Sequence, residues 1–124
     1  MYKLLLIALG GAAGTVARYG TQSVLAPVSE RFPFGTLAVN VAGCFLMGFL
    51  QALFADRLLV RPECRMAILV GFLGGYTTFS TFGWETTALL QDGQFARATA
   101  NVLISNVACV LVVIGGYAIG VRTS

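Results

Sequence analysis

Apolar residues fill four long stretches of this chain, and polar residues gather in the short segments between them. The apolar stretches cover approximately residues 2–26, 34–54, 66–90 and 97–121. About 20 predominantly apolar residues are enough for a helix to cross the hydrocarbon core of a membrane. The pattern therefore predicts an all-α membrane protein with four transmembrane helices, in a single transmembrane domain that covers residues 1–124.

The third predicted span contains positions that a plain lipid-facing helix avoids. Gly74 and Gly75 are adjacent, and a glycine weakens a helix by about 0.8–1 kcal/mol relative to alanine. Four hydroxyl residues follow within a few positions, interleaved with phenylalanines: Thr77, Thr78, Ser80 and Thr81. Backbone that leaves helical pairing is tolerated at membrane depth only where protein or a water-filled cavity covers it. We therefore expect a third helix that is broken near Gly74 to Thr78, with unwinding at the two glycines, at a functional site.

The first and second spans each hold one deep polar residue that has two interpretations. Arg18 lies about two-thirds along the first span, either beside Tyr19 in a belt near the membrane surface or at the entrance of an anion pathway. Asn40 lies deep in the second span, with Thr36 four residues earlier on the same helix face. A buried amide must find a partner, so Asn40 either joins two helices by hydrogen bonds or serves a ligand.

The fourth span has a polar stripe, because Asn101, Ser105 and Cys109 recur every four residues. Small residues four apart, at Gly10–Gly14 and again at Gly116–Gly120, predict close approach of helix backbones. Glu85 is the only acidic residue within a predicted span, and its position favours an interfacial residue close to the span end.

Composition supports a membrane protein and excludes several functions. Charged residues make up 10% of the 124 residues, whereas a soluble domain carries about 25%. The net charge of +3 is small and scattered, so we expect no nucleic-acid partner. The chain has no histidine, and its three cysteines lack CxxC spacing, which argues against a zinc site or a disulfide framework. With no paired carboxylates and no nucleophile beside a base, an enzyme is not expected.

Basic residues are divided almost evenly between the two sides that four spans define. One side would hold Lys3, Arg57, Arg61, Arg65 and Arg122, and the other would hold Arg31 and Arg97, with Arg18 nearer to it. Such a weak bias is what a protein that inserts in both orientations would show.

The residues around the expected break are suited to binding ions. Carbonyls freed by unwinding are hard oxygen ligands, and such groups coordinate Na⁺ in membrane transporters. Phe79 and Phe82 are three residues apart and so point the same way on a helix. An aromatic ring has a positive edge and a negative face, so the pair could stabilise an anion edge-on or a cation face-on, or could simply pack against neighbouring helices.

Three motifs in order along the chain resemble the bacterial fluoride ion channel family (Fluc/CrcB) over essentially its full length. They are Gly10–Tyr19, Gly35–Asn40 followed by Gly43, and Gly71–Phe82. The last contains GGYTTFSTF, which joins the expected break to hydroxyl and phenylalanine positions at fixed spacing. Asn101 stands where some members of the family have tyrosine, and Cys109 stands where a hydroxyl would be expected.

The resemblance implies a passive, fluoride-selective channel in the bacterial cytoplasmic (inner) membrane that lowers cytoplasmic fluoride and confers resistance. It also implies an antiparallel, dual-topology homodimer with a structural Na⁺ at its centre, held by main-chain oxygens of Gly74 and Thr77. Asn40, Phe79 and Phe82 would contact fluoride, and Arg18 would lie near the aqueous vestibule. The hydroxyls expected along the pathway are those of Thr36, Ser80 and Ser105.

Two other functions fit parts of the pattern. A small proton-coupled exporter of drugs or other cations also has about this length and four spans, but its mechanism requires a deep carboxylate in the first span, where this chain has none. A structural or assembly protein would account for the glycine spacings and the deep amides. It would not account for hydroxyls clustered beside a break in the third span.

Overall fold

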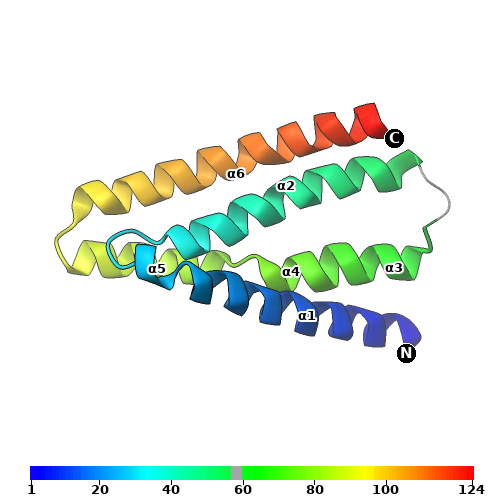
Figure 1. Cartoon of the computed structure of the whole chain (residues 1–124), viewed down its shortest axis with the longest axis horizontal. Helices are drawn as coiled ribbons and strands as arrows, with labels where there is room; N and C mark the ends of the chain where they lie inside the picture. The colour runs from blue at the N-terminus through cyan, green and yellow to red at the C-terminus, as the bar shows by residue number, and fades with distance from the viewer. Residues whose placement is uncertain (57–59) are drawn as a thin grey trace.

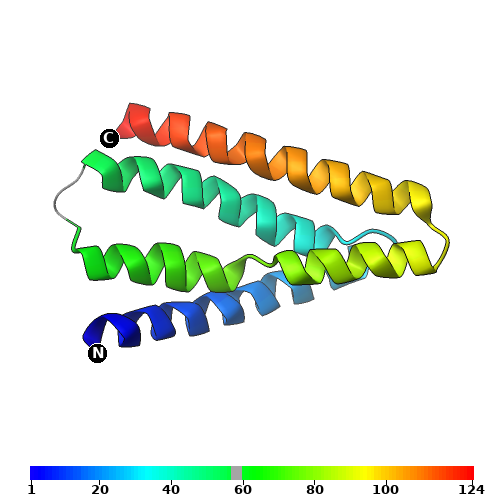
Figure 2. The same ribbon diagram turned by 180° about the vertical axis from the view of Figure 1, so that it is seen from behind.

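The computed structural model describes residues 1–56 and 60–124, so Arg57 of the predicted charged loop lies outside the described residues. Four rods of helix lie side by side (Figures 1 and 2), and both termini are at the same end of the bundle. The first rod is α1 (Tyr2–Val24), the second is α2 (Phe34–Asp56) and the fourth is α6 (Phe95–Thr123). Among the described residues, four helices are long and apolar enough to cross a membrane, which confirms the prediction of an all-helical protein with four spans.

The third rod consists of several consecutive helical segments. It begins with α3 (Pro62–Met66), continues as the π-helical η2 (Ala67–Phe72) and the single turn α4 (Leu73–Tyr76), and resumes as α5 (Phe79–Gln91). Thr77 and Thr78 between α4 and α5 have extended backbone, with φ/ψ of −85°/157° and −152°/113°. These extended residues lie within the stretch Gly74 to Thr78 where a break is expected, but Gly74 and Gly75 are themselves helical, so the expected unwinding at the two glycines is wrong in position.

Glycines bring the backbones of α1 and the third rod into direct contact. A methyl group at Gly14 would overlap the carbonyl of Phe72, and one at Gly10 would overlap the carbonyl of Ala67. The close approach predicted from the Gly10–Gly14 spacing is therefore confirmed. The third rod contributes glycine to the same seam, because a methyl group at Gly75 would lie 2.6 Å from the carbonyl oxygen of Gly11.

The helices α2 and α6 pack together more extensively than any other pair of described elements, and they run in the same direction (Figures 1 and 2). A methyl group at Gly116 would overlap the carbonyl of Phe45, and one at Gly120 would lie 2.6 Å from that of Phe49. The second predicted glycine spacing thus also marks a close helix contact. The 3₁₀ turn η1 (Ala26–Val28) and residues 29–33 connect α1 to α2.

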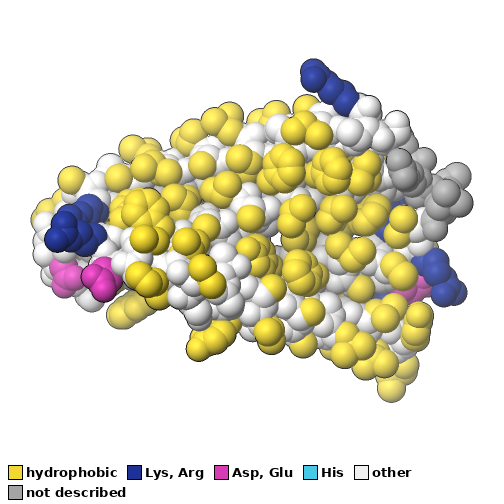
Figure 3. Space-filling model, viewed as in Figure 1, with side chains coloured by type: hydrophobic (Ala, Val, Ile, Leu, Met, Phe, Trp, Pro, Cys, Tyr) yellow, Lys and Arg dark blue, Asp and Glu magenta, His cyan; other side chains and the backbone are white. Residues whose placement is uncertain are grey.

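Charged side chains lie at the two ends of the molecule in Figure 3, and apolar side chains cover the length between them. Many large apolar residues along the rods are exposed, including Leu9, Val16, Leu103 and Ile114. A surface of this kind would be unfavourable in water and is suited to lipid, because lipid tails solvate apolar side chains.

Candidate functional site

The junction between α4 and α5 consists of Thr77 and Thr78, and the side chain of Thr78 caps the start of α5. The Thr81 N–H donates to Thr78 Oγ1 at 3.3 Å, which makes Thr78 the N-cap residue of α5. Its hydroxyl in turn donates to Thr81 Oγ1 at 3.0 Å. A β-branched residue favours extended backbone, and a threonine hydroxyl satisfies a free N–H at the start of a helix. Two properties of threonine therefore place the junction at this point of the third rod.

Asn40 on α2 holds the junction through two hydrogen bonds to the backbone of one residue. The Thr78 N–H donates to Asn40 Oδ1 at 2.8 Å, and Asn40 Nδ2 donates to the Thr78 carbonyl at 3.0 Å. An asparagine amide has two N–H donors. Within the described residues the second one has no hydrogen-bond partner, so it remains available to a ligand.

A cavity of about 240 Å³ lies against this junction, and we call it the junction pocket. Its lining residues are all uncharged: Asn40, Cys44, Thr77, Thr78, Phe79, Phe82, Ser105, Asn106, Cys109 and Val110. The rings of Phe79 and Phe82 have centroids 5.2 Å apart and planes tilted by 40°. Phe82 is buried, whereas Phe79 is 75% exposed and extends to the surface of the chain. The pocket thus offers the side-chain amides of Asn40 and Asn106 and two aromatic rings in uncharged surroundings.

Ser105 lines the junction pocket, but its hydroxyl belongs to a chain of hydrogen bonds between α6 and α5. Ser105 Oγ donates to Asn101 Oδ1 at 3.2 Å, and Asn101 Nδ2 donates to Thr86 Oγ1 at 2.9 Å. The Thr86 hydroxyl ends the chain by donating to the carbonyl of Phe82 at 2.8 Å. Ser105 therefore presents an oxygen lone pair to the pocket unless its hydroxyl turns away from Asn101.

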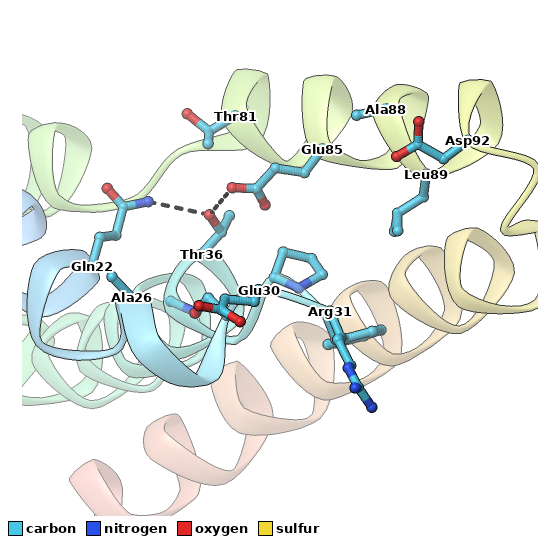
Figure 4. A pocket seen from close by; sticks show the side chains of 14 residues that line it. Gln22, Ala26, Glu30, Arg31, Thr36, Thr81, Glu85, Ala88, Leu89 and Asp92 are labelled. Carbon is cyan, nitrogen blue, oxygen red and sulfur yellow. Dashed lines mark hydrogen bonds between the residues drawn. The ribbon is translucent and has the colours of Figure 1, made fainter.

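A second cavity, of about 550 Å³, lies where α1, α2 and α5 approach the α1–α2 connection (Figure 4); we call it the Glu85 cavity. Gln22 Nε2 donates to Thr36 Oγ1 at 3.1 Å, and the Thr36 hydroxyl donates to Glu85 Oε1 at 2.7 Å. The other carboxylate oxygen of Glu85 is buried and has no hydrogen-bond partner among the described residues. Glu30 and Asp92 add two further acidic groups to the lining.

The structure gathers some of the predicted site residues and separates others. Asn40, Phe79, Phe82, Ser105 and Thr77 line the junction pocket together. The others lie elsewhere: Thr36 faces the Glu85 cavity, Ser80 and Gly74 are exposed, and Arg18 is half-buried on α1 and lines neither cavity.

The sequence did not identify the partners of Thr36 or the link from Asn101 to Thr86. Glu85 is the only acidic residue in a predicted span, yet its depth alone could not show that it accepts a hydrogen bond from Thr36 on another helix. The four-residue stripe of Asn101 and Ser105 was the available signal for the second network, and α5 supplies its unexpected member, Thr86.

The carbonyls of Gly74 and Thr77 are suited to a cation. In a continuous α-helix the N–H groups of Thr78 and Thr81 would donate to these two carbonyls. Both N–H groups instead donate to side chains, to Asn40 and to Thr78 respectively. The described residues contain no cluster of three or more histidine, cysteine, aspartate or glutamate side chains. The two carbonyls are thus hard oxygen groups without their usual helical donors.

Four apolar spans, three of which line a small uncharged pocket, define a helical membrane protein whose site offers hydrogen-bond donors and aromatic rings. The family model for CrcB-like protein, Camphor Resistance (CrcB), matches residues 5–117, and the chain belongs to this family. The family is one of ion channels and not of enzymes, and the chain is a multi-pass protein of the bacterial inner membrane.

Proteins named fluoride-specific ion channel FluC are similar to this chain over most of its length. One from Solibacter usitatus is 53% identical over 103 residues, which are 82% of this chain and 84% of that protein. One from Maridesulfovibrio salexigens is 41% identical over 121 residues, or 97% and 96% of the two chains. A third, from Methylococcus capsulatus, is 50% identical over 112 residues. This match covers 90% of this chain and 49% of that protein.

Proposed function

We propose that this protein is a fluoride-selective channel that lets fluoride leave the cytoplasm passively, and so confers resistance to it. The observation that supports this most directly is the Asn40 amide, which Thr78 fixes in place while one N–H stays free beside the junction pocket. The names of the relatives supply the identity of the ion.

The uncharged lining of the junction pocket suits conduction of a small, strongly hydrated anion. A conducting site must bind well enough to replace water and weakly enough to release the ion. Dipoles meet both requirements better than a full positive charge, which would hold the anion. The Asn40 N–H and the positive edges of Phe79 and Phe82 are the groups that would replace water around fluoride.

Two of the predicted hydroxyls have other bonds in this arrangement. The Thr36 hydroxyl donates to Glu85 and the Ser105 hydroxyl donates to Asn101, so each hydroxyl would have to rotate before it could donate to fluoride. Ser80 is exposed and 3.4 Å from Thr78 Oγ1, so its hydroxyl is the freer donor of the three. Arg18 would act at a distance, by attracting anions towards the membrane surface.

We further infer an antiparallel, dual-topology homodimer in which a broken third span carries a structural Na⁺. Gly74 is exposed and so is Phe79, which leaves a carbonyl-bearing turn and a large ring on the surface of a single chain. A second copy related by a two-fold axis would cover both. The Gly74 and Thr77 carbonyls would hold the ion, which would neutralise the oxygen dipoles gathered there.

Fluoride release from liposomes tests the channel. Purified protein in potassium fluoride liposomes should release fluoride to an external electrode when a potassium ionophore is added, and the same vesicles should retain chloride. Equal release of chloride, or no release of fluoride from folded protein, would contradict the proposal.

Sodium is tested separately by thermal unfolding in detergent. A ligand that binds only the folded state raises its stability by mass action. Na⁺ should therefore raise the unfolding midpoint above that in K⁺ or choline at equal ionic strength. Equal midpoints in the three salts would remove the sodium site and leave the channel proposal standing.

Glu85 is the one observation that favours a proton-coupled exporter instead. One of its carboxylate oxygens has no hydrogen-bond partner in the described part of the chain, and it faces a cavity of about 550 Å³. An exporter of this kind would require a proton gradient for transport. Fluoride release driven by membrane potential alone, at equal pH on both sides, therefore distinguishes the channel from the exporter.

A further inference from the structure

Two thiols from different helices meet at the junction pocket, and the proposed conduction uses neither. Cys44 on α2 and Cys109 on α6 both line the pocket, and the two side chains are neighbours that interact electrostatically. Cys44 is one helical turn after Asn40, and Cys109 is one turn after Ser105. A cysteine pair at this place is therefore next to the groups that would contact the ion.

The packing of α2 against α6 holds the two cysteines at the same level. A methyl group at Gly48, one turn after Cys44, would overlap the carbonyl of Val113, which is one turn after Cys109. Because the two helices run in the same direction (Figure 2), Cys44 and Cys109 each lie one turn before the residues of this backbone contact. The position of the pair thus depends on helix backbones and not on flexible side chains.

The chemistry of the pair selects a particular kind of ligand. Thiolates are soft ligands that prefer soft metal ions, and the thiolate is the form that binds. Two thiolates and one divalent cation make a neutral group, which avoids the large cost of burying net charge in the membrane interior. A structural zinc site needs four ligands, but the described residues hold no cluster of three or more histidine, cysteine or acidic side chains. A soft ion that accepts two-coordinate binding, such as Hg²⁺, meets these conditions.

We propose that Cys44 and Cys109 form a binding site for a soft divalent metal cation inside the junction pocket. The two thiols lose their protons, and two metal–sulfur bonds form, so that one cation replaces two protons. The bound cation narrows the pocket beside Asn40 and Phe82 and obstructs ion flow. Binding is independent of what the pocket conducts, whereas the obstruction rests on the proposed fluoride channel.

Binding is measured in detergent with reduced protein and mercuric acetate as the source of Hg²⁺. Cys64 is in α3 and lines neither cavity, so Cys64→Ser removes the third thiol and keeps the pair. One Hg²⁺ per chain should protect both remaining thiols of this variant from a maleimide, even in the presence of a monothiol competitor. Adding Cys44→Ser or Cys109→Ser should abolish that protection. Equal protection with one thiol as with two would overturn the site.

The consequence for transport is measured as the ratio of fluoride efflux with and without Hg²⁺ for each variant in liposomes. Efflux should fall to background in the wild type and in Cys64→Ser, and a dithiol should restore it. The single variants Cys44→Ser and Cys109→Ser should show little change in the ratio. Equal inhibition of the variant that lacks both residues would overturn the proposed obstruction. If untreated protein conducts no fluoride, the channel proposal fails, while the thiol-protection result still decides the metal site.

Discussion

Asn40 and Thr78 exchange two hydrogen bonds across the α2–α5 contact, of 2.8 Å and 3.0 Å, although they are 38 residues apart in the chain. The Asn40 side chain thereby replaces the partners that the Thr78 N–H and carbonyl would have in a continuous helix. This pairing lets the third rod leave helical geometry inside a membrane without an unsatisfied N–H at Thr78, and it holds Asn40 at the junction pocket, which it lines.

Asn40→Asp should reduce fluoride efflux at least about tenfold. A carboxylate can accept from the Thr78 N–H but cannot donate to its carbonyl, and leaving a buried group unsatisfied costs about 1–3 kcal/mol. The added negative charge also repels an anion. Gln51→Glu is the matched control, because it puts the same charge on an exposed position of the same helix. Efflux from the Asn40→Asp protein equal to that of the control would remove Asn40 from the pathway.

Phe82→Ile should also greatly reduce efflux, because isoleucine is apolar but has no positive ring edge to offer an anion. Phe82 is 7% exposed, so the substitution also changes packing, and thermal unfolding must show that the variant is folded. Phe95→Ile makes the same chemical change at a 65% exposed position and should conduct normally. Normal conduction by a folded Phe82→Ile protein would show that the ring has only a packing role.

Thr78→Val should destabilise the protein by about 0.5–2 kcal/mol, the usual cost of losing an N-cap. Valine keeps the β-branched shape that suits the extended backbone, but it cannot accept from the Thr81 N–H. Thr78→Ser retains the hydroxyl and should stay close to the wild type. Unfolding in detergent measures both, and similar stabilities for Val and Ser would mean that the cap is unimportant.

Gly116→Ala should destabilise the protein, whereas Gly115→Ala should not. A methyl group at Gly116 would overlap the carbonyl of Phe45, and one at Gly115 would meet no atom within 4 Å. Separating α2 from α6 would also displace Asn40 relative to Ser105, so efflux should fall together with stability. Equal unfolding temperatures for these neighbouring substitutions would contradict the backbone contact.

The number of spans and the glycine contacts could be predicted because they depend on local patterns. A run of apolar residues is long enough to cross a membrane wherever it later packs, and the Gly10–Gly14 and Gly116–Gly120 spacings each mark one helix face. The exact residues at which the third rod leaves helical geometry, Thr77 and Thr78, could not be predicted in this way. Glycine propensity pointed to Gly74–Gly75, but a single glycine costs only about 1 kcal/mol, which tertiary contacts readily outweigh.

The partners of polar residues could not be predicted, because they lie on other helices. The sequence suggested Thr36 as a donor to an anion, yet its hydroxyl donates a hydrogen bond to Glu85 on α5. Ser105 was expected to donate to an anion in the same way, yet its hydroxyl donates a hydrogen bond to Asn101. The sequence does suggest which groups need partners, since buried polar atoms are nearly always bonded. The choice among several possible partners depends on helix packing, and so does the π-helical geometry of η2.

The contact of Gly14 with the Phe72 carbonyl bears on which positions of this protein can tolerate substitutions. The glycine contacts between α1 and the third rod involve no residue of the junction pocket, whose lining comes from α2, the third rod and α6. Much of the helix packing is thus specified by positions outside the pocket, whereas Asn40 and Thr78 line the pocket and also hold the third rod. A laboratory selection for a different anion could randomise the other pocket residues and hold the seam, Asn40 and Thr78 constant, and most of the resulting variants should still insert and fold.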